Sequence, residues 1–172
     1  MRTLHNIDLK NNESGFTLRW QDRLILSHTA DAPCLWIGAG EADIEMFRGN
    51  FSIKDKLNEK IALTNATVTQ QSAGWAIRFT RGDAVSATLL VGVDGEGRLE
   101  LKLKNDAASH NRIWLRLAAQ PDDHIYGCGE QFSYFDLRGK PFPLWTSEQG
   151  VGRNKQTYVT WQRSEERRVG KE

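Results

Sequence analysis

Cysteine is scarce in this chain and histidine is scattered. Only two cysteines, Cys34 and Cys128, occur in 172 residues, and neither has a CxxC partner or a Cys/His neighbour at metal-ligand spacing. This argues against a disulfide scaffold and predicts reduced, buried thiols. The histidines show neither H-x-H nor i, i+4 spacing, so no metal site is expected. They are His5, His28, His110 and His124.

Long apolar runs and an excess of charge are also missing. No run approaches the roughly 18 apolar residues that span a bilayer, and the N-terminal MRTLHNIDLKNNE lacks the apolar core of a signal peptide. The formal net charge is +1 and the pI is about 7.8, without a basic stripe. Neither nucleic acid nor an anionic membrane is therefore an expected partner. A cytoplasmic protein is predicted.

Apolar side chains that alternate with polar ones are the dominant pattern. Alternation of period two is typical of a strand with one face on a core and the other in water. The expected core-facing positions are Phe16, Leu18, Trp20, Leu24 and Leu26 in one run, Trp75, Ile77 and Phe79 in a second, Val85, Ala87, Leu89, Val91 and Val93 in a third, Leu99, Leu101 and Leu103 in a fourth, and Ile113, Leu115 and Leu117 in a fifth.

Polar stretches that favour turns separate these runs. The sequence Asp94-Gly95-Glu96-Gly97 predicts a short hairpin, because glycine adopts the positive φ of tight turns. Many short strands at this spacing predict an all-β protein, an antiparallel β-sandwich. Residues 51–60 (FSIKDKLNEK) are expected to carry at most one helical turn.

Residues 124–153 are rich in glycine, aromatic residues and charge. Their Gly127-Cys128-Gly129-Glu130 segment does not match a dinucleotide site, because Phe132 stands where the third glycine belongs. No cofactor is expected. Carboxylates are available, but the sequence does not place them as the pair, about 5–10 Å apart, that glycoside hydrolysis requires. They are Glu130, Asp136 and Glu148. A G-x-S-x-G motif is also missing, so no complete catalytic constellation is present.

Aromatic side chains are dense in the same stretch. Such rings stack on the C–H faces of sugars, while neighbouring polar groups orient the hydroxyls. They equally anchor a loop that lacks a core of its own. Both interpretations stay open for Phe132, Tyr134, Phe135, Phe142 and Trp145.

The order of motifs in this stretch resembles the N-terminal β-sandwich of family 31 glycoside hydrolases. The motifs are Tyr126-Gly127-x-Gly129-Glu130, then Arg138-Gly139, then Leu144-Trp145 followed by an acid. Residues 47–57 and 124–162 are most similar to the sulfoquinovosidase branch of that family, the α-glycosidases that release sulfoquinovose from sulfoquinovosyl glycerol. The resemblance covers residues 13–162.

The resemblance implies a galactose mutarotase-like sandwich followed by a catalytic (β/α)8 barrel. In the family, two aspartates of that barrel carry out retaining hydrolysis, and a barrel needs about 250 residues. No catalytic residue is therefore expected in this chain, and the chain alone is expected to be inactive. Its expected partners are the barrel and, in the whole enzyme, a small-molecule glycoside.

The resemblance also implies a few site residues. Glu148 matches an acid on a loop at the rim of the sugar pocket, although this chain has Thr146 where the family has Asn and Glu148 where it has Asp. Trp145, Gln149 and Arg153 are its expected neighbours on the rim. Structural roles in the loop are expected for Tyr126, Gly127, Gly129, Glu130, Arg138 and Gly139, with an ion pair between Glu130 and Arg138.

The expected domain organisation is a sandwich over residues 1–162, incomplete, and a charged tail over residues 163–172. The tail, RSEERRVGKE, has only one apolar residue, Val169, and such a segment is expected to be disordered and not native to the domain. Two alternatives remain open. One is a stand-alone carbohydrate-binding sandwich, and the other is a mutarotase-type enzyme with a catalytic histidine and a carboxylate on one sheet.

Overall fold

A computed structural model describes residues 6–47, 50–82, 85–106, 108–127 and 134–140. The chain divides into two compact units, which we describe separately. The first comprises residues 1–41 and 55–119, and the second comprises residues 42–54 and 120–172. The described residues contain no helix, and hence none that is long and apolar enough to cross a membrane.

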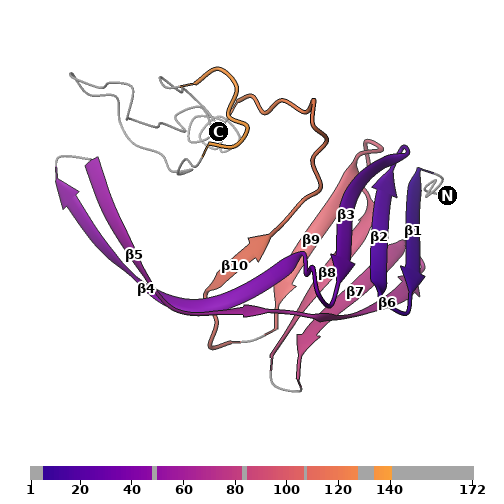
Figure 1. Cartoon of the computed structure of the whole chain (residues 1–172), viewed down its shortest axis with the longest axis horizontal. Helices are drawn as coiled ribbons and strands as arrows, with labels where there is room; N and C mark the ends of the chain where they lie inside the picture. The colour runs from indigo at the N-terminus through magenta and orange to yellow at the C-terminus, as the bar shows by residue number, and fades with distance from the viewer. Residues whose placement is uncertain (1–5, 48–49, 83–84, 107, 128–133, 141–172) are drawn as a thin grey trace. The chain divides into compact units, whose positions relative to one another are not determined.

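The described residues form ten strands in three antiparallel sheets (Figure 1). The strands are β1 (Ile7–Asn12), β2 (Gly15–Trp20), β3 (Arg23–Thr29), β4 (Leu35–Phe47), β5 (Asn50–Ala62), β6 (Asn65–Gln71), β7 (Gly74–Arg81), β8 (Val85–Val93), β9 (Leu99–Asn105) and β10 (Arg112–Leu115). The sheet orders are β1-β2-β3, β10-β4-β5 and β6-β7-β8-β9. The all-β, antiparallel prediction is confirmed.

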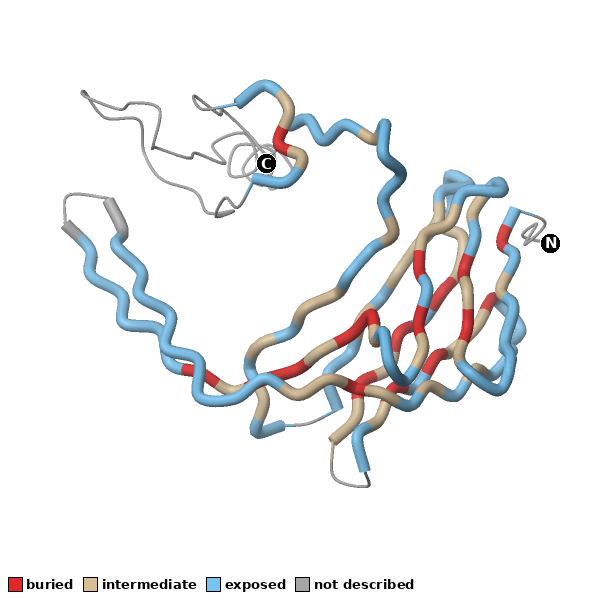
Figure 2. Tube along the Cα trace, in the orientation of Figure 1, coloured by how far each residue is buried: buried red, intermediate tan, exposed pale blue. Residues whose placement is uncertain are grey.

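The core of the first unit lies between the β1-β2-β3 and β6-β7-β8-β9 sheets. Phe16 of β2 meets Phe79 of β7 edge to face, with ring centroids 5.8 Å apart. Leu18 and Leu26 from one sheet and Leu89 from the other are fully buried in the same cluster. Figure 2 shows the buried positions of β2, β3, β7 and β8 along these two layers. Two sheets joined by one apolar layer make a β-sandwich.

Strand β8 shows the expected alternation most clearly. Ala87, Leu89 and Val91 are buried, whereas Leu90, between two of them, is 40% exposed. Successive side chains of a strand point to opposite faces, so the period-two pattern identified the core face correctly here. The expected hairpin between β8 and β9 is also present, with Gly97 at φ 82°.

Residues 16–26 correct the first expectation, because they form two strands and not one. The chain reverses at Gln21 and Asp22, which have φ values of 49° and 64°, and Trp20 pairs directly with Arg23 across this two-residue turn. Positive φ at both central positions is characteristic of tight hairpins. Neither residue is glycine, so this turn was not predicted from the sequence.

Residues 51–60 correct the second expectation, because they belong to strand β5 and not to a helical turn. Pairing with β4 supplies the backbone hydrogen bonds that a helical turn would otherwise have to supply. The approach is close, since a Cβ built on Gly40 of β4 would lie 2.9 Å from the carbonyl oxygen of Lys56. Pairing with β4, which no pattern within residues 51–60 indicates, therefore determines this conformation.

The run at residues 113–117 is corrected in part. Strand β10 ends at Leu115, and Ile113 and Leu117, expected on the core face, are 42% and 54% exposed. After Leu115 the Arg116 N–H donates to the Cys34 carbonyl at 2.8 Å, which continues the pairing with β4 by one step. The Ala118 N–H then donates to the Ile25 carbonyl of β3 at 2.8 Å, so the chain leaves its pairing with β4 before Leu117 could occupy a core position of that sheet.

Candidate functional site

The predicted site residues fall partly outside the described residues. The predicted residues outside the described part are Gly129, Glu130, Trp145, Glu148, Gln149 and Arg153. Their expected roles stay predictions, and so does the ion pair between Glu130 and Arg138. Tyr126, Gly127, Arg138 and Gly139 are described, within segments 120–127 and 134–140 of the second unit. We refer to these two segments as the loop.

Asp136 is the centre of the described loop. Its Oδ2 lies 2.7 Å from His124 Nδ1, and its Oδ1 accepts hydrogen bonds from the backbone N–H groups of Ile125, at 3.1 Å, and Arg138, at 3.0 Å. The hydrogen bond from His124 and these two backbone bonds lower the pKa of Asp136 to about 2. One ionised carboxylate thus joins the two segments through His124 and Ile125, and it fixes the backbone of its own segment through Arg138.

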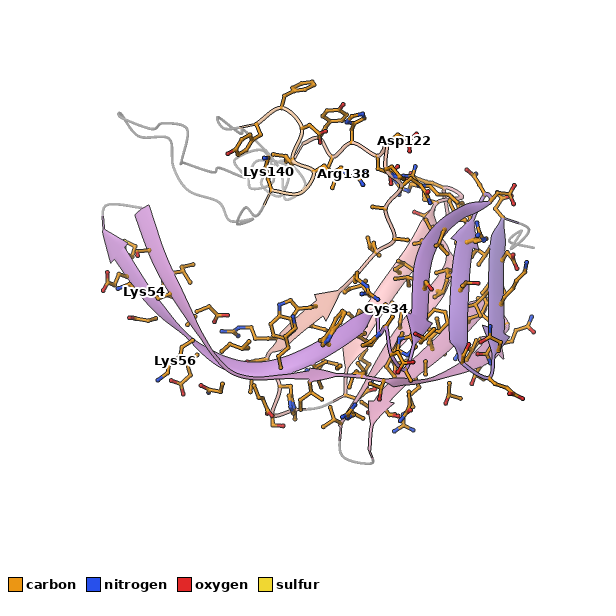
Figure 3. The ribbon with its side chains drawn as sticks, in the orientation of Figure 1. Cys34, Lys54, Lys56, Asp122, Arg138 and Lys140 are labelled. Atoms are coloured by element: carbon orange, nitrogen blue, oxygen red, sulfur yellow. The ribbon has the colours of Figure 1, made fainter. Side chains whose placement is uncertain are left out.

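Arg138 adds further bonds within the loop. Its Nη1 donates to the backbone carbonyls of Gln120 and Asp123, the latter at 2.7 Å. The Gln120–Asp123 turn closes on itself, because Asp123 Oδ2 accepts from the Gln120 N–H at 2.8 Å. Leu137, which is 2% exposed, donates its N–H to the Ile125 carbonyl at 2.8 Å. Figure 3 labels Arg138 and Lys140 on this loop.

Aromatic rings and two glycines complete the described part of the loop. The Tyr126 ring lies between His124, at 5.9 Å between centroids, and Phe135, at 5.0 Å. Gly127 and Gly139 have φ values of 94° and 66°, a region that other residues adopt only at a cost. The described carboxylates and rings therefore shape the backbone of this loop, and they do not form a catalytic pair.

We predict that Asp136→Ala loosens the loop. The amide hydrogens of Ile125 and Arg138 are expected to exchange about tenfold faster or more, because their acceptor is removed. Hydrogen exchange followed by NMR measures this. Asp122→Ala is the matched control, since Asp122 is exposed and should leave both rates unchanged. Equal rates in the two variants would show that Asp136 does not organise the loop.

A second polar cluster, which the sequence did not indicate, lies in the core of the first unit. His28 is 1% exposed; its Nε2 donates to the Thr64 carbonyl at 3.2 Å, and its Nδ1 accepts from the Cys34 N–H at 3.3 Å. A carbonyl only accepts and an amide N–H only donates, so the ring is neutral with its proton on Nε2. Burial lowers the pKa of His28, against a smaller opposing effect of the Thr64 bond.

Cys34 does not form a nucleophile–base pair with His28. The Sγ lies 3.6 Å from Nδ1, but burial raises the pKa of the thiol to about 11, and a reactive cysteine requires a lowered pKa. The prediction of a buried thiol is confirmed for Cys34, which is a free cysteine (Figure 3). Cys128 lies outside the described residues.

A mutarotase-type site is not supported by the histidine–carboxylate pairs of the described residues. His110 Nε2 lies 3.2 Å from Glu59 Oε1, and His124 Nδ1 lies 2.7 Å from Asp136 Oδ2. At these separations each pair is in direct contact, with no room for a sugar between the acid and the base. Within the part of the chain that the structure describes, no three His, Cys, Asp or Glu side chains gather as metal ligands.

Comparison with known proteins agrees with this architecture. A family model for the N-terminal galactose mutarotase-like domain of glycosyl hydrolase family 31 matches residues 8–161. The sulfoquinovosidase of Escherichia coli strain K12 is 71% identical over 92% of this chain, and that of Agrobacterium fabrum strain C58 is 41% identical over 88%. The chain spans 24% and 22% of the lengths of these relatives.

A solved structure shows the same fold. A family 31 sulfoquinovosidase from E. rectale, in complex with the aza-sugar inhibitor IFGSQ, matches with a TM-score of 0.70 and 38% identity, over 92% of this chain and 23% of the other. The chain therefore belongs to the galactose mutarotase-like domains found at the N-terminus of family 31 glycosyl hydrolases. The resemblance seen in the sequence motifs is confirmed.

Proposed function

We propose that this chain is the N-terminal part of a retaining α-glycosidase that hydrolyses α-sulfoquinovosides such as sulfoquinovosyl glycerol. The observation that carries the proposal is the 71% identity to the E. coli sulfoquinovosidase over 92% of the chain. The catalytic aspartates belong to a barrel that these 172 residues are too few to include. The chain supplies a scaffold and part of the rim of the sugar pocket.

The domain boundary in this proposal lies at residue 162. The family match, which ends at residue 161, supports it, and it leaves the charged residues 163–172 outside the sandwich. The rim consists of Trp145, Glu148, Gln149 and Arg153, next to the loop that Asp136 and Arg138 hold. The small-molecule partner is the glycoside, and the location is cytoplasmic, with which the free thiol of Cys34 is consistent.

The activity is tested with a chimera. In it, the segment of the E. coli relative that matches this chain over 159 residues is replaced by the corresponding residues of this chain. We expect the chimera to release 4-nitrophenol from its α-sulfoquinovoside, and the isolated chain to release none. The control is the relative with that segment deleted, which should be inactive. A folded chimera without activity, or turnover by the isolated chain, would refute the proposal.

The rim is tested in the same chimera. Glu148→Gln is expected to lower kcat/KM roughly tenfold or more, since hydrogen bonds to a charged group are among the stronger ones. Glu100→Gln is the control, because Glu100 pairs with Lys102 on the surface of the sandwich at 2.8 Å. Unchanged kinetics in the Glu148 variant would remove this residue from the rim.

A further inference from the structure

The part of the β10-β4-β5 sheet that belongs to the first unit carries two tryptophans on its outer face. Trp36 of β4 and Trp114 of β10 are directly paired across the sheet. Their neighbours Leu35 and Ile37 are fully buried in the core, so the tryptophans point to the other side. Both rings are half-buried, and large aromatic side chains of this kind are typical of interaction surfaces.

Two cations lie on these rings. The Nζ of Lys60 is 4.6 Å from the centroid of the Trp114 ring and 5.3 Å from that of Trp36. The guanidinium carbon of Arg116 is 5.5 Å from the Trp36 ring, and Arg116 Nη2 donates to the Ala32 carbonyl at 3.0 Å. We refer to Trp36, Lys60, Trp114 and Arg116 as the cationic platform. Its charges are held in place by the rings beneath them.

The position of the Trp114 ring depends on a glycine. Gly38 lies two residues after Trp36 on β4 and pairs with Arg112. A Cβ built on Gly38 would lie 2.9 Å from Cζ3 and 3.0 Å from Cη2 of Trp114. The ring therefore lies flat across the β4 backbone and not away from the sheet. This places it under Lys60, so the backbone itself builds the platform.

The cations of the platform have no carboxylate partner among the described residues. The contrast is Arg112 on the same sheet, which binds Asp55 through two nitrogens, the shorter contact being 2.7 Å. Lys60 and Arg116 have no such ion pair within the described part of the chain. An anionic group brought to this face would meet two positioned positive charges.

We propose that the cationic platform binds a carboxylate-bearing surface of the remainder of the glycosidase, the part of the polypeptide that this chain does not span. This inference rests on the proposed function. The relatives are about four times as long as the segment matched here, and the platform offers charges and apolar rings to a large neighbour. A stacked sugar is disfavoured as the occupant, because Lys60 already lies over both rings.

The first test is lysine labelling in the chimera. Lys60 is expected to be acetylated several times more slowly than Lys102, an exposed lysine of β9 that is paired with Glu100. Mass spectrometry of tryptic peptides gives both rates without any substitution. Equal rates, in a chimera that hydrolyses the α-sulfoquinovoside, would overturn the inference while leaving the proposed function intact. An inactive chimera would refute the proposed function instead.

The second test removes the charges. In the chimera, the double variant Lys60→Gln/Arg116→Gln is expected to lower the thermal midpoint by about 2 °C or more and to weaken its dependence on NaCl. Lys102→Gln and the charge-conserving Lys60→Arg/Arg116→Lys variant should both stay close to the parent. If all variants behave alike, the platform has no partner in the chimera. If instead the double variant changes only the oligomeric state in light scattering, a second copy is the occupant and the inference is wrong.

Discussion

Leu89→Ala is expected to lower the free energy of unfolding of the chain by about 2–5 kcal/mol, the usual cost of truncating a buried leucine. Leu89 has no exposed surface and belongs to the cluster that joins the two sheets. Truncation removes apolar contacts and leaves a cavity, because the neighbouring strands β7 and β9 hold the β8 backbone in register. Urea denaturation followed by tryptophan fluorescence measures the loss.

Leu90→Ala is the matched control for this substitution. It removes the same atoms from the next residue of the same strand, but on the opposite face, where Leu90 is 40% exposed. Its cost is expected to stay below about 1 kcal/mol, since surface substitutions have small effects. Equal losses in the two variants would contradict the placement of the core on one face of β8.

The strands that the sequence predicted are those whose pattern is set by burial on one face. From Ala87 to Val91 in β8 the alternation and the burial agree, because water on one side and a core on the other select opposite side chains. The same agreement holds for Phe16 and Leu18 of β2, both buried. Where one face of a strand lies on a core, a local pattern is sufficient.

Strand β5 shows why the other elements could not be predicted in this way. The described side chains from Ser52 to Lys60 are all exposed, so no contrast between the two faces is present in the sequence. Its conformation depends on hydrogen bonds to β4, and a pairing partner leaves no local trace in a polar segment. The turn at Gln21 and Asp22 was missed for a related reason, because the pairing of β2 with β3 imposes positive φ on two residues that are not glycine.

The candidate site was predictable only in its residue types. Asp136 stood out as a loop carboxylate, but its partner His124 is 12 residues away, and no spacing rule connects them. The His28 cluster is harder still, because Thr64 is 36 residues from the histidine that donates to it. Such contacts follow from the packing of sheets, whereas the family motifs carried information about the loop that spacing alone does not contain.

His28 is expected to make the sandwich sensitive to mild acid. Burial lowers the pKa of the folded-state histidine below its usual value near 6.5. The unfolded chain therefore binds a proton at higher pH than the folded chain does, and stability is lost as the pH falls below about 6.5. As the pH falls below about 6.5, the free energy of unfolding should decrease by at most about 1.4 kcal/mol per pH unit, until the lowered folded pKa is reached.

Burial is the main cause of this loss, and the added proton would have to sit on Nδ1, because Nε2 already donates to the Thr64 carbonyl. Nδ1 now accepts a hydrogen bond from the Cys34 N–H, so a proton on Nδ1 would point at that N–H group. The positive charge of Arg116 also opposes protonation of the ring. His28→Phe keeps a ring stacked against Phe16, whose centroid lies 5.5 Å away, but removes the titration, so the slope of stability with pH should disappear. The variant should also be less stable at pH 7.5, by about 1–3 kcal/mol, because the Cys34 N–H and the Thr64 carbonyl lose their partner. His124→Gln, at an exposed histidine, should retain the slope. A slope that persists in His28→Phe would assign the acid sensitivity to another group.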